Sequence, residues 1–177
     1  MATFVALLRG VNVSGKNKLP MADLRAAVES AGFSNVRIYL QSGNVVVDSK
    51  GSAKSIGQQI HQLIDDNFSL DVSVLVRTAR QWHQVAASNS YFEAGIDPKR
   101  LYVTFTGRKT KSSDKKRLDT IKLGEDRYSL HGSEIYLDLV SGAGRTKLTN
   151  NAIEKKLEVV ATTRNWRTVQ QILAMLP

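Results

Sequence analysis

The hydrophobic pattern of the first ninety residues alternates between strand-like and helix-like stretches. Strand-like stretches are predicted at Thr3–Arg9, Val36–Gln41, Asn44–Asp48 and Val72–Arg77. Apolar residues at helical spacing predict one helix over Met21–Ala31 and a second over the stretch from Ile56 to Phe68. The predicted order is therefore β-α-β-β-α-β.

This order predicts a ferredoxin-like antiparallel sheet with the strand order 4-1-3-2. The first and third strands are apolar on both faces, as central strands should be, whereas the second and fourth alternate apolar and polar residues, as edge strands do. Ser42-Gly43 is expected to form a two-residue turn, which makes the second and third strands antiparallel.

The second half restarts the same pattern. Strands are predicted at Leu101–Thr106, Arg127–His131 and Glu134–Val140, and helices at Ser112–Leu123, Thr149–Leu157 and Asn165–Leu176. Ser113 is expected to cap the first of these helices and Asn165 the last. The sequence thus predicts an α+β protein of two ferredoxin-like halves, residues 1–90 and 91–177, with antiparallel sheets, helices on one face and a second half (βαββαα) that ends in helices.

The chain contains no cysteine, and its three histidines are far apart in the sequence. Thiolate chemistry is therefore excluded, and we expect neither a metal site nor a cofactor. No two carboxylates are spaced for acid–base work, and Asp138 is expected to point outward from its strand. Whether the protein is an enzyme stays open.

A net charge of +9 favours anionic partners, and the segment Lys99–Arg127 alone holds ten lysines and arginines against four acidic residues. No apolar run is long enough to span a bilayer, so no membrane partner is expected. The N-terminus is predicted to be a strand and not a signal peptide, and with the lack of cysteine this suggests a cytoplasmic protein. The oligomeric state is left open.

The loop Arg9–Pro20, RGVNVSGKNKLP, follows a central strand and precedes a helix. Its Gly10-x4-Gly15-Lys16-Asn17 nearly matches a nucleotide-triphosphate loop. However, Asn17 lacks the hydroxyl that binds Mg²⁺, Pro20 delays the helix, and the sheet is antiparallel. We therefore expect a more general anion-binding loop, or one that is purely structural.

The predicted strand order places this loop beside the turn between the second and third strands. Arg9, Asn12 and Lys16 should lie near Gln41 and Asn44, a group rich in donors and poor in carboxylates that could bind an anion or the edge of a base. The alternative is turn chemistry, since asparagine and glycine are common in hairpins for conformational reasons.

Two further basic stretches are candidates. Arg145 and Lys147 follow two glycines in the loop Ser141–Asn150. Arg164 and Asn165 stand at the start of the last predicted helix, where an arginine opposes the helix dipole. Trp166 beside them is expected in the core.

These stretches resemble one known family. They are similar in residues and order to the bacterial family called domain of unknown function 1697, with a minor departure at Ser14. The similar segments are LLRGVNVSGKNKLPMADLR, YLQSGNVV, GRTKLTN and TTRNWRTV. The resemblance implies a two-part α/β fold of ferredoxin-like pieces and a cytoplasmic bacterial protein. It implies no activity.

Three functions remain open. The first is binding of a phosphate-bearing or other anionic ligand, a nucleotide or a nucleic acid, through Arg9, Asn12, Lys16, Gln41, Asn44, Arg145, Lys147, Arg164 and Asn165. The second is a small-molecule enzyme with Lys16 or Lys147 as the acid–base group. The third is a protein-interaction module or homo-oligomer that uses its edge strands.

Overall fold

A computed structural model describes all residues, 1–177, and divides them into two compact units. The first unit comprises Met1–His83 and Met175–Pro177, and the second comprises Gln84–Ala174. The first contains β1 (Ala2–Leu8), α1 (Met21–Ser30), β2 (Ser34–Tyr39), β3 (Asn44–Ser49), α2 (Ala53–Phe68), β4 (Val74–Thr78) and the start of α3 (Ala79–Ala87). The second contains α4 (Ser90–Glu93), a 3-10 turn η1 (Pro98–Arg100), β5 (Leu101–Thr106), α5 (Ser112–Leu118), β6 (Arg127–His131), β7 (Glu134–Asp138), α6 (Asn150–Leu157), β8 (Ala161–Asn165) and α7 (Trp166–Leu173).

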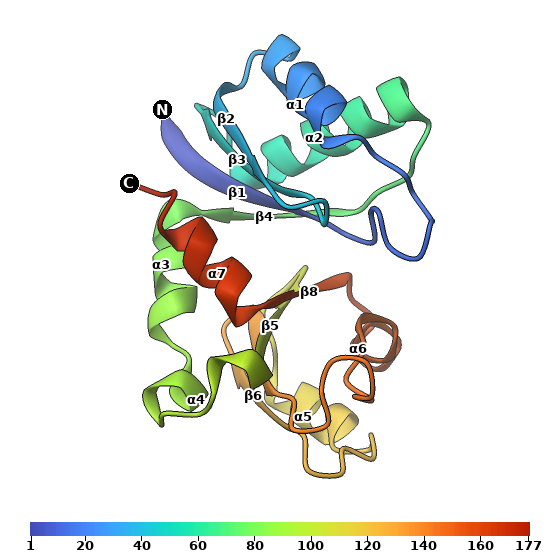
Figure 1. The fold of residues 1–177 in the computed structure, drawn as a ribbon, viewed down its shortest axis with the longest axis vertical. Coiled ribbons are helices and arrows are strands. Elements are labelled where there is room, and N and C mark those ends of the chain that lie inside the picture. Colours follow the sequence, from blue (N-terminus) through green and yellow to red (C-terminus); the bar gives the residue numbers. More distant parts are fainter. The chain divides into compact units, whose positions relative to one another are not determined.

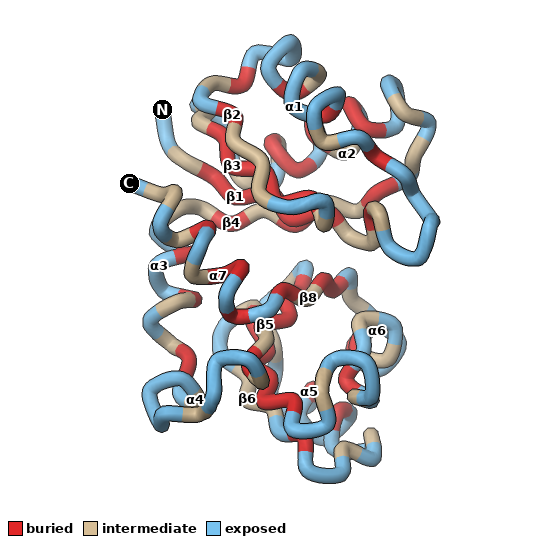
Figure 2. Tube along the Cα trace, in the orientation of Figure 1, coloured by how far each residue is buried: buried red, intermediate tan, exposed pale blue.

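The first sheet has the order β2-β3-β1-β4, antiparallel throughout, which confirms the predicted order 4-1-3-2. Helices α1 and α2 cover one of its faces (Figure 1), and the buried stretches gather on the strands and on the inward side of the helices (Figure 2). Ser52 begins α2 by accepting a hydrogen bond from the Ser55 amide, and the apolar stripe through Ile56, Ile60 and Ile64 then packs into this core.

The turn between β2 and β3 differs from the predicted two-residue turn. Tyr39 pairs with Asn44, so the loop has four residues, and Leu40 adopts a positive φ of 62°. Gly43 lies so close to Leu8 that an added Cβ would be 2.8 Å from its side chain. The close approach, and not a two-residue turn, is what requires glycine here.

The second sheet has the order β6-β7-β5-β8, with α5 and α6 packed on a core that includes Leu118, Ile153 and Leu157. The prediction that the second half continues from one helix directly into the next was wrong, because β8 lies between α6 and α7. Its sequence, ATTRN, carries too few apolar residues to show strand alternation. The predicted fold class, α+β with two similar ferredoxin-like halves, is confirmed.

The helices of the second half depart from prediction at several ends. The helix predicted over Ser112–Leu123 ends at Leu118, and the one predicted over Asn165–Leu176 ends at Leu173. Asn165 caps α7 as expected, accepting a hydrogen bond from the Thr168 amide at 2.8 Å. Lys111 and not Ser113 is the N-cap of α5, and the Asp114 carboxylate accepts the Lys111 amide at 2.8 Å.

The two units repeat one plan in detail. Val5 in β1 pairs with Arg77 in β4, and Val103 in β5 pairs with Arg164 in β8. Each arginine is the penultimate residue of its strand, and each Nη1 donates to the carbonyl of the preceding residue, at 3.1 and 3.0 Å. The similarity therefore extends from strand order to the register of individual residues.

The observed division between the units falls after His83, within α3, where the sequence suggested a boundary between residues 90 and 91. The last three residues group with the first unit, in which Arg37 Nη1 donates to the Met175 carbonyl. None of the helices combines the length and apolar character that crossing a bilayer would require.

Replacement of Gly43 by alanine should destabilise the protein by roughly 2–4 kcal/mol, because it adds a side-chain clash to the strain of a positive φ. Gly15→Ala is the matched control, since its φ is also positive, at 74°, but its Cβ would meet nothing within 4 Å. Gly15→Ala should lower the free energy of unfolding by only about 1 kcal/mol. Urea unfolding measures the stability of both variants. If Gly43→Ala and Gly15→Ala lose the same amount of stability, the contact between Gly43 and Leu8 is not tight.

Candidate functional site

The loop after β1 and the turn after β2 meet at one end of the first sheet, as predicted from the strand order. The Leu8 amide donates to the Gly43 carbonyl at 2.9 Å, and Asn12 Nδ2 donates to the Gln41 carbonyl at 2.8 Å. We call residues 9–19 and 40–44 together the loop rim.

The side chain of Asn12 holds the two segments of the loop rim together by hydrogen bonds. Its Nδ2 donates to the carbonyls of Leu19 and Gln41, at 2.9 and 2.8 Å, and its Oδ1 accepts the Leu19 amide at 2.8 Å. Its positive φ of 53° suits asparagine. Asn17 adds a further tie, since its Nδ2 donates to the Gly10 carbonyl at 3.0 Å.

Between these ties the chain forms a miniature hairpin. Val13 and Lys16 pair as an antiparallel bridge, and the Lys16 amide donates to the Val13 carbonyl at 2.9 Å. Ser14 and Gly15 between them both have positive φ, which is the signature of a type I′ turn. The turn holds Val13 and Lys16 on the surface, and both are exposed.

Asn44, expected as a ligand-binding donor, is completely buried. Its Nδ2 donates to the Tyr39 carbonyl at 2.7 Å and to Ser42 Oγ at 3.2 Å, so it closes the turn from inside. Of the amide side chains expected at the loop rim, only that of Gln41 lies on the surface without a side-chain hydrogen bond. Asn12 and Asn44 therefore act as structural groups.

The loop rim presents its charge through two lysines. Lys16 and Lys18 are both exposed, and neither ammonium group has a hydrogen-bond or ion-pair partner. Arg9 is half-buried, and its amide donates to the Ser73 carbonyl at 2.9 Å. The charge available to a ligand here therefore lies on Lys16 and Lys18.

The second candidate loop is pinned by Asp126. Its buried carboxylate accepts the Ser141 amide at 2.9 Å and the Ser141 hydroxyl at 2.7 Å. Burial works to raise the pKa of Asp126, but hydrogen bonds from Ser141, Thr146 and the backbone of Val140 outweigh it and hold that pKa below its ordinary value. Beyond this anchor the loop displays Arg145 and Lys147, which are exposed and unpaired.

The third stretch is part of the framework of the second unit. Arg164 is buried, and its Nη1 donates to Thr162 Oγ1 at 2.8 Å and to the Thr163 carbonyl at 3.0 Å. The side-chain oxygen of Asn165 is occupied by the cap of α7. Trp166 is buried, as predicted for a core residue.

Half of the basic residues in the segment Lys99–Arg127 are in ion pairs, and two of them share one carboxylate. Of its ten lysines and arginines, those in ion pairs are Arg100, Arg108, Lys115, Arg117 and Arg127. The expectation that Asp138 points outward was wrong, because Asp138 is completely buried and pairs with both Arg100 and Arg127. The predicted hairpin places Arg127 opposite Asp138 on the neighbouring strand, and this pairing could have indicated an ion pair.

Two buried aspartates, Asp114 and Asp138, are held in the ionised form by arginines. Burial acts to raise the pKa of Asp138, but its two arginines overcome this and hold the pKa below the ordinary value. The hydrogen bond from Arg108 likewise lowers the pKa of Asp114. These carboxylates are therefore ionised at neutral pH, and no group of three or more histidine, aspartate or glutamate side chains lies together.

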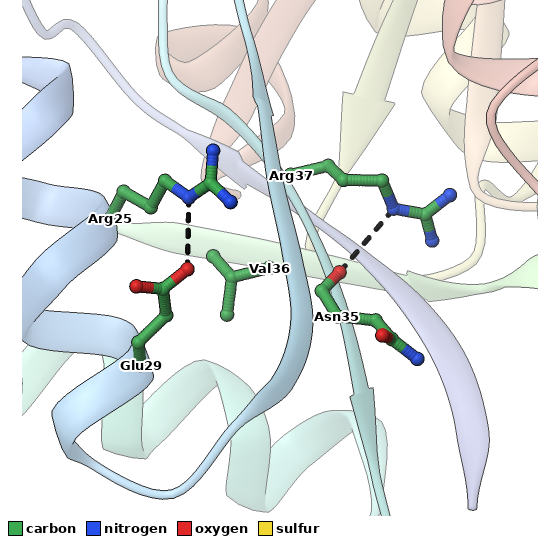
Figure 3. Close-up of a pocket in the computed structure, with 5 residues that line it drawn as sticks. All are labelled: Arg25, Glu29, Asn35, Val36 and Arg37. Atoms are coloured by element: carbon green, nitrogen blue, oxygen red, sulfur yellow. Dashed lines mark hydrogen bonds and ion pairs between the residues drawn. The ribbon is translucent and has the colours of Figure 1, made fainter.

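One surface depression of about 550 Å³ lies beside β2, away from the loop rim residues. Figure 3 shows that Arg25, Glu29 and Val36 lie on one side of the strand, whereas Arg37 and Asn35 point to the other. Arg25 Nε donates to Glu29 at 2.9 Å, so the two charges satisfy each other. The lining does not converge on a common point.

Replacement of Asp126 by asparagine should destabilise the protein at pH 7 by about 1–3 kcal/mol, because an amide in this place cannot accept every bond that the carboxylate accepts. A depressed pKa in the folded state means that the contribution of Asp126 is complete above the unfolded-state pKa and is lost as the pH falls through the folded one, below about pH 4. Urea unfolding from pH 7 downward should therefore show the two proteins converging in acid. A difference that is constant with pH would contradict this role.

Comparisons with known proteins agree with this architecture. The family described as "Protein of unknown function (DUF1697)" matches residues 1–136. The solved structure of the conserved bacterial protein SP0830 from Streptococcus pneumoniae is similar, with a TM-score of 0.72, 22% identity and 99% of each chain covered. A comparison with curated proteins gives no match. Because the family match spans most of the sequence, the chain belongs to the DUF1697 family.

Proposed function

We propose that this protein binds the phosphate backbone of nucleic acid through the exposed lysines of the loop rim. The observation that carries the proposal is that Lys16 and Lys18 are exposed and unpaired on a loop whose asparagines, Asn12 and Asn17, are bonded internally. Lysines without acidic partners can neutralise phosphates, and the release of the cations condensed on the nucleic acid is then a large source of affinity.

A fixed loop favours this function energetically. The Asn12 bonds and the type I′ turn already hold the backbone beside Lys16, so little further ordering is needed when a ligand binds. The same bonds occupy Asn12 and Asn44, so Gln41 is the one amide side chain among the expected donors that could meet a base edge. The proposal is therefore binding with little sequence preference.

A polyanion is also favoured by the charge that each unit displays when it is taken by itself. Each unit separately displays unpaired basic residues on a loop, namely Lys16 and Lys18 in the first and Arg145 and Lys147 in the second. Recognition by stacking of bases on the first sheet has little support, because Phe4 is the one aromatic residue of β1 and β3 and it is buried in the core. A cytoplasmic location in a bacterium, which we also propose, would supply such a partner.

A lysine-based enzyme is less well supported. A lysine that accepts a proton at neutral pH is usually desolvated, and Lys16 and Lys147 are both exposed.

Replacement of Lys16 and Lys18 together by glutamine should weaken binding of a fluorescent oligonucleotide and flatten its salt dependence. The slope of log affinity against log salt should fall by about 1.4 for a single strand or 1.8 for a duplex, because two phosphate contacts are lost. Fluorescence anisotropy at several salt concentrations measures both effects.

The matched control is Lys50→Gln with Lys54→Gln. These lysines are also exposed and unpaired, but they follow the opposite end of β3 from the loop rim. An equal loss in this control would leave only a general effect of net charge. Wild-type binding that does not change with salt would end the proposal.

A second candidate, protein contact, rests on two exposed apolar side chains at the same place. Val13 is 56% and Leu40 is 51% exposed, and each is adjacent in sequence to one partner of the Asn12–Gln41 hydrogen bond. Leu40 also holds a positive φ, which costs a leucine more than it costs an asparagine.

Leu40→Asn should therefore leave the stability unchanged or higher while removing apolar surface from the loop rim. If the loop rim is a contact between copies, the variant should dissociate at concentrations where the wild type associates, as measured by analytical ultracentrifugation. A wild type that is monomeric at every concentration would exclude self-association through this surface.

A further inference from the structure

In the second unit, one buried carboxylate holds two arginines. Arg100 Nε and Nη2 donate to the two oxygens of Asp138, at 2.8 and 2.7 Å. Arg127 Nε and Nη2 both donate to Asp138 Oδ2, at 3.1 and 2.5 Å. The two Nη2 atoms share one acceptor oxygen, so the two guanidinium groups are fixed side by side.

The arrangement leaves N–H groups without acceptors. Each guanidinium carries five N–H donors, and neither Nη1 atom has a protein partner. The side chains are 37% exposed for Arg100 and 53% for Arg127, so water reaches both. The ring of Tyr91 lies against Arg127, 5.3 Å from its guanidinium carbon, and restrains the group further.

The fold itself does not require two arginines here. Asp48 in the first unit occupies the same place as Asp138, since each pairs with the first residue of the neighbouring strand, Ser34 in β2 and Arg127 in β6. Asp48 is served by neutral groups, accepting from Thr3 Oγ1 and Asn35 Nδ2 at 2.7 Å each.

Nor does burial of the carboxylate require a second arginine. Asp114 is also buried, and Arg108 alone binds both of its oxygens, at 2.7 and 3.0 Å. Two further N–H groups of Arg108 go to the carbonyls of Lys109 and Leu157, so only Nε lacks an acceptor. That pair is neutral and leaves one N–H group open, whereas Arg100, Arg127 and Asp138 together keep a charge of +1 and leave both Nη1 groups open.

We propose that Arg100 and Arg127, oriented by Asp138, form a binding site for a phosphate group. A planar carboxylate is satisfied by one guanidinium fork, whereas a tetrahedral phosphate offers oxygens to two forks in different planes. The site lies within the second unit, apart from the lysines of the loop rim, and it does not depend on the binding of nucleic acid.

Inorganic phosphate is the probe, added to the full-length protein at constant ionic strength set with sodium chloride. The Nε–H NMR signals of Arg100 and Arg127 should shift together and saturate. Arg127→Gln should weaken the binding about tenfold or more, the effect of losing one charge-assisted contact. This variant should still fold, because Arg100 continues to bind both oxygens of Asp138.

Arg117→Gln is the matched control, since Arg117 forms a single exposed ion pair with Glu158. It should leave the affinity for phosphate unchanged. Shifts that grow linearly without saturation, or equal affinity in Arg127→Gln and wild type, would overturn the proposal. Acetate binding as tightly as phosphate would show that the site takes carboxylates instead. Loss of nucleic-acid binding in the Lys16 and Lys18 variant tests the other function independently.

Discussion

The first unit depends on the close approach of Gly43 to Leu8. The ladder between the two central strands runs to this point, where the Leu8 amide meets the Gly43 carbonyl and no side chain fits between them. Because of this contact, β1 leaves the sheet toward Asn12 and the turn before β3 leaves it toward Gln41, so the two segments meet. The position of Lys16 on the surface follows from it.

The strand order and the meeting of the two loops could be predicted from sequence because both depend on hydrophobic pattern and connection rules. Pattern shows which residues are apolar, and the topology then brings distant loops to one edge of the sheet. The strand β8 was missed because Thr162, Thr163 and Arg164 carry no apolar alternation, although threonine favours strands. Tertiary pairing with β5, which no local pattern reports, forms this strand.

The roles of the polar residues were much harder to predict. Asn12, Asn44 and Asn165 are good donors and acceptors for a ligand and equally good ones for the backbone, and in the structure each bonds to the backbone. Asp138 lies in a strand whose residues are all buried, so alternation could not place it. The lysines, by contrast, are all exposed in the structure, because desolvation of an ammonium group is too costly without a partner.

The repetition of one plan in both units has a consequence for how new chemistry arises in such a chain. Equivalent positions, such as those of Asp48 and Asp138, share the same strand pairing but have different hydrogen-bond donors, neutral in one unit and cationic in the other. The fold therefore tolerates a change in the net charge around this position without a change in strand pairing. One unit can therefore gain charged side chains around this carboxylate while the equivalent carboxylate of the other unit keeps a purely structural role.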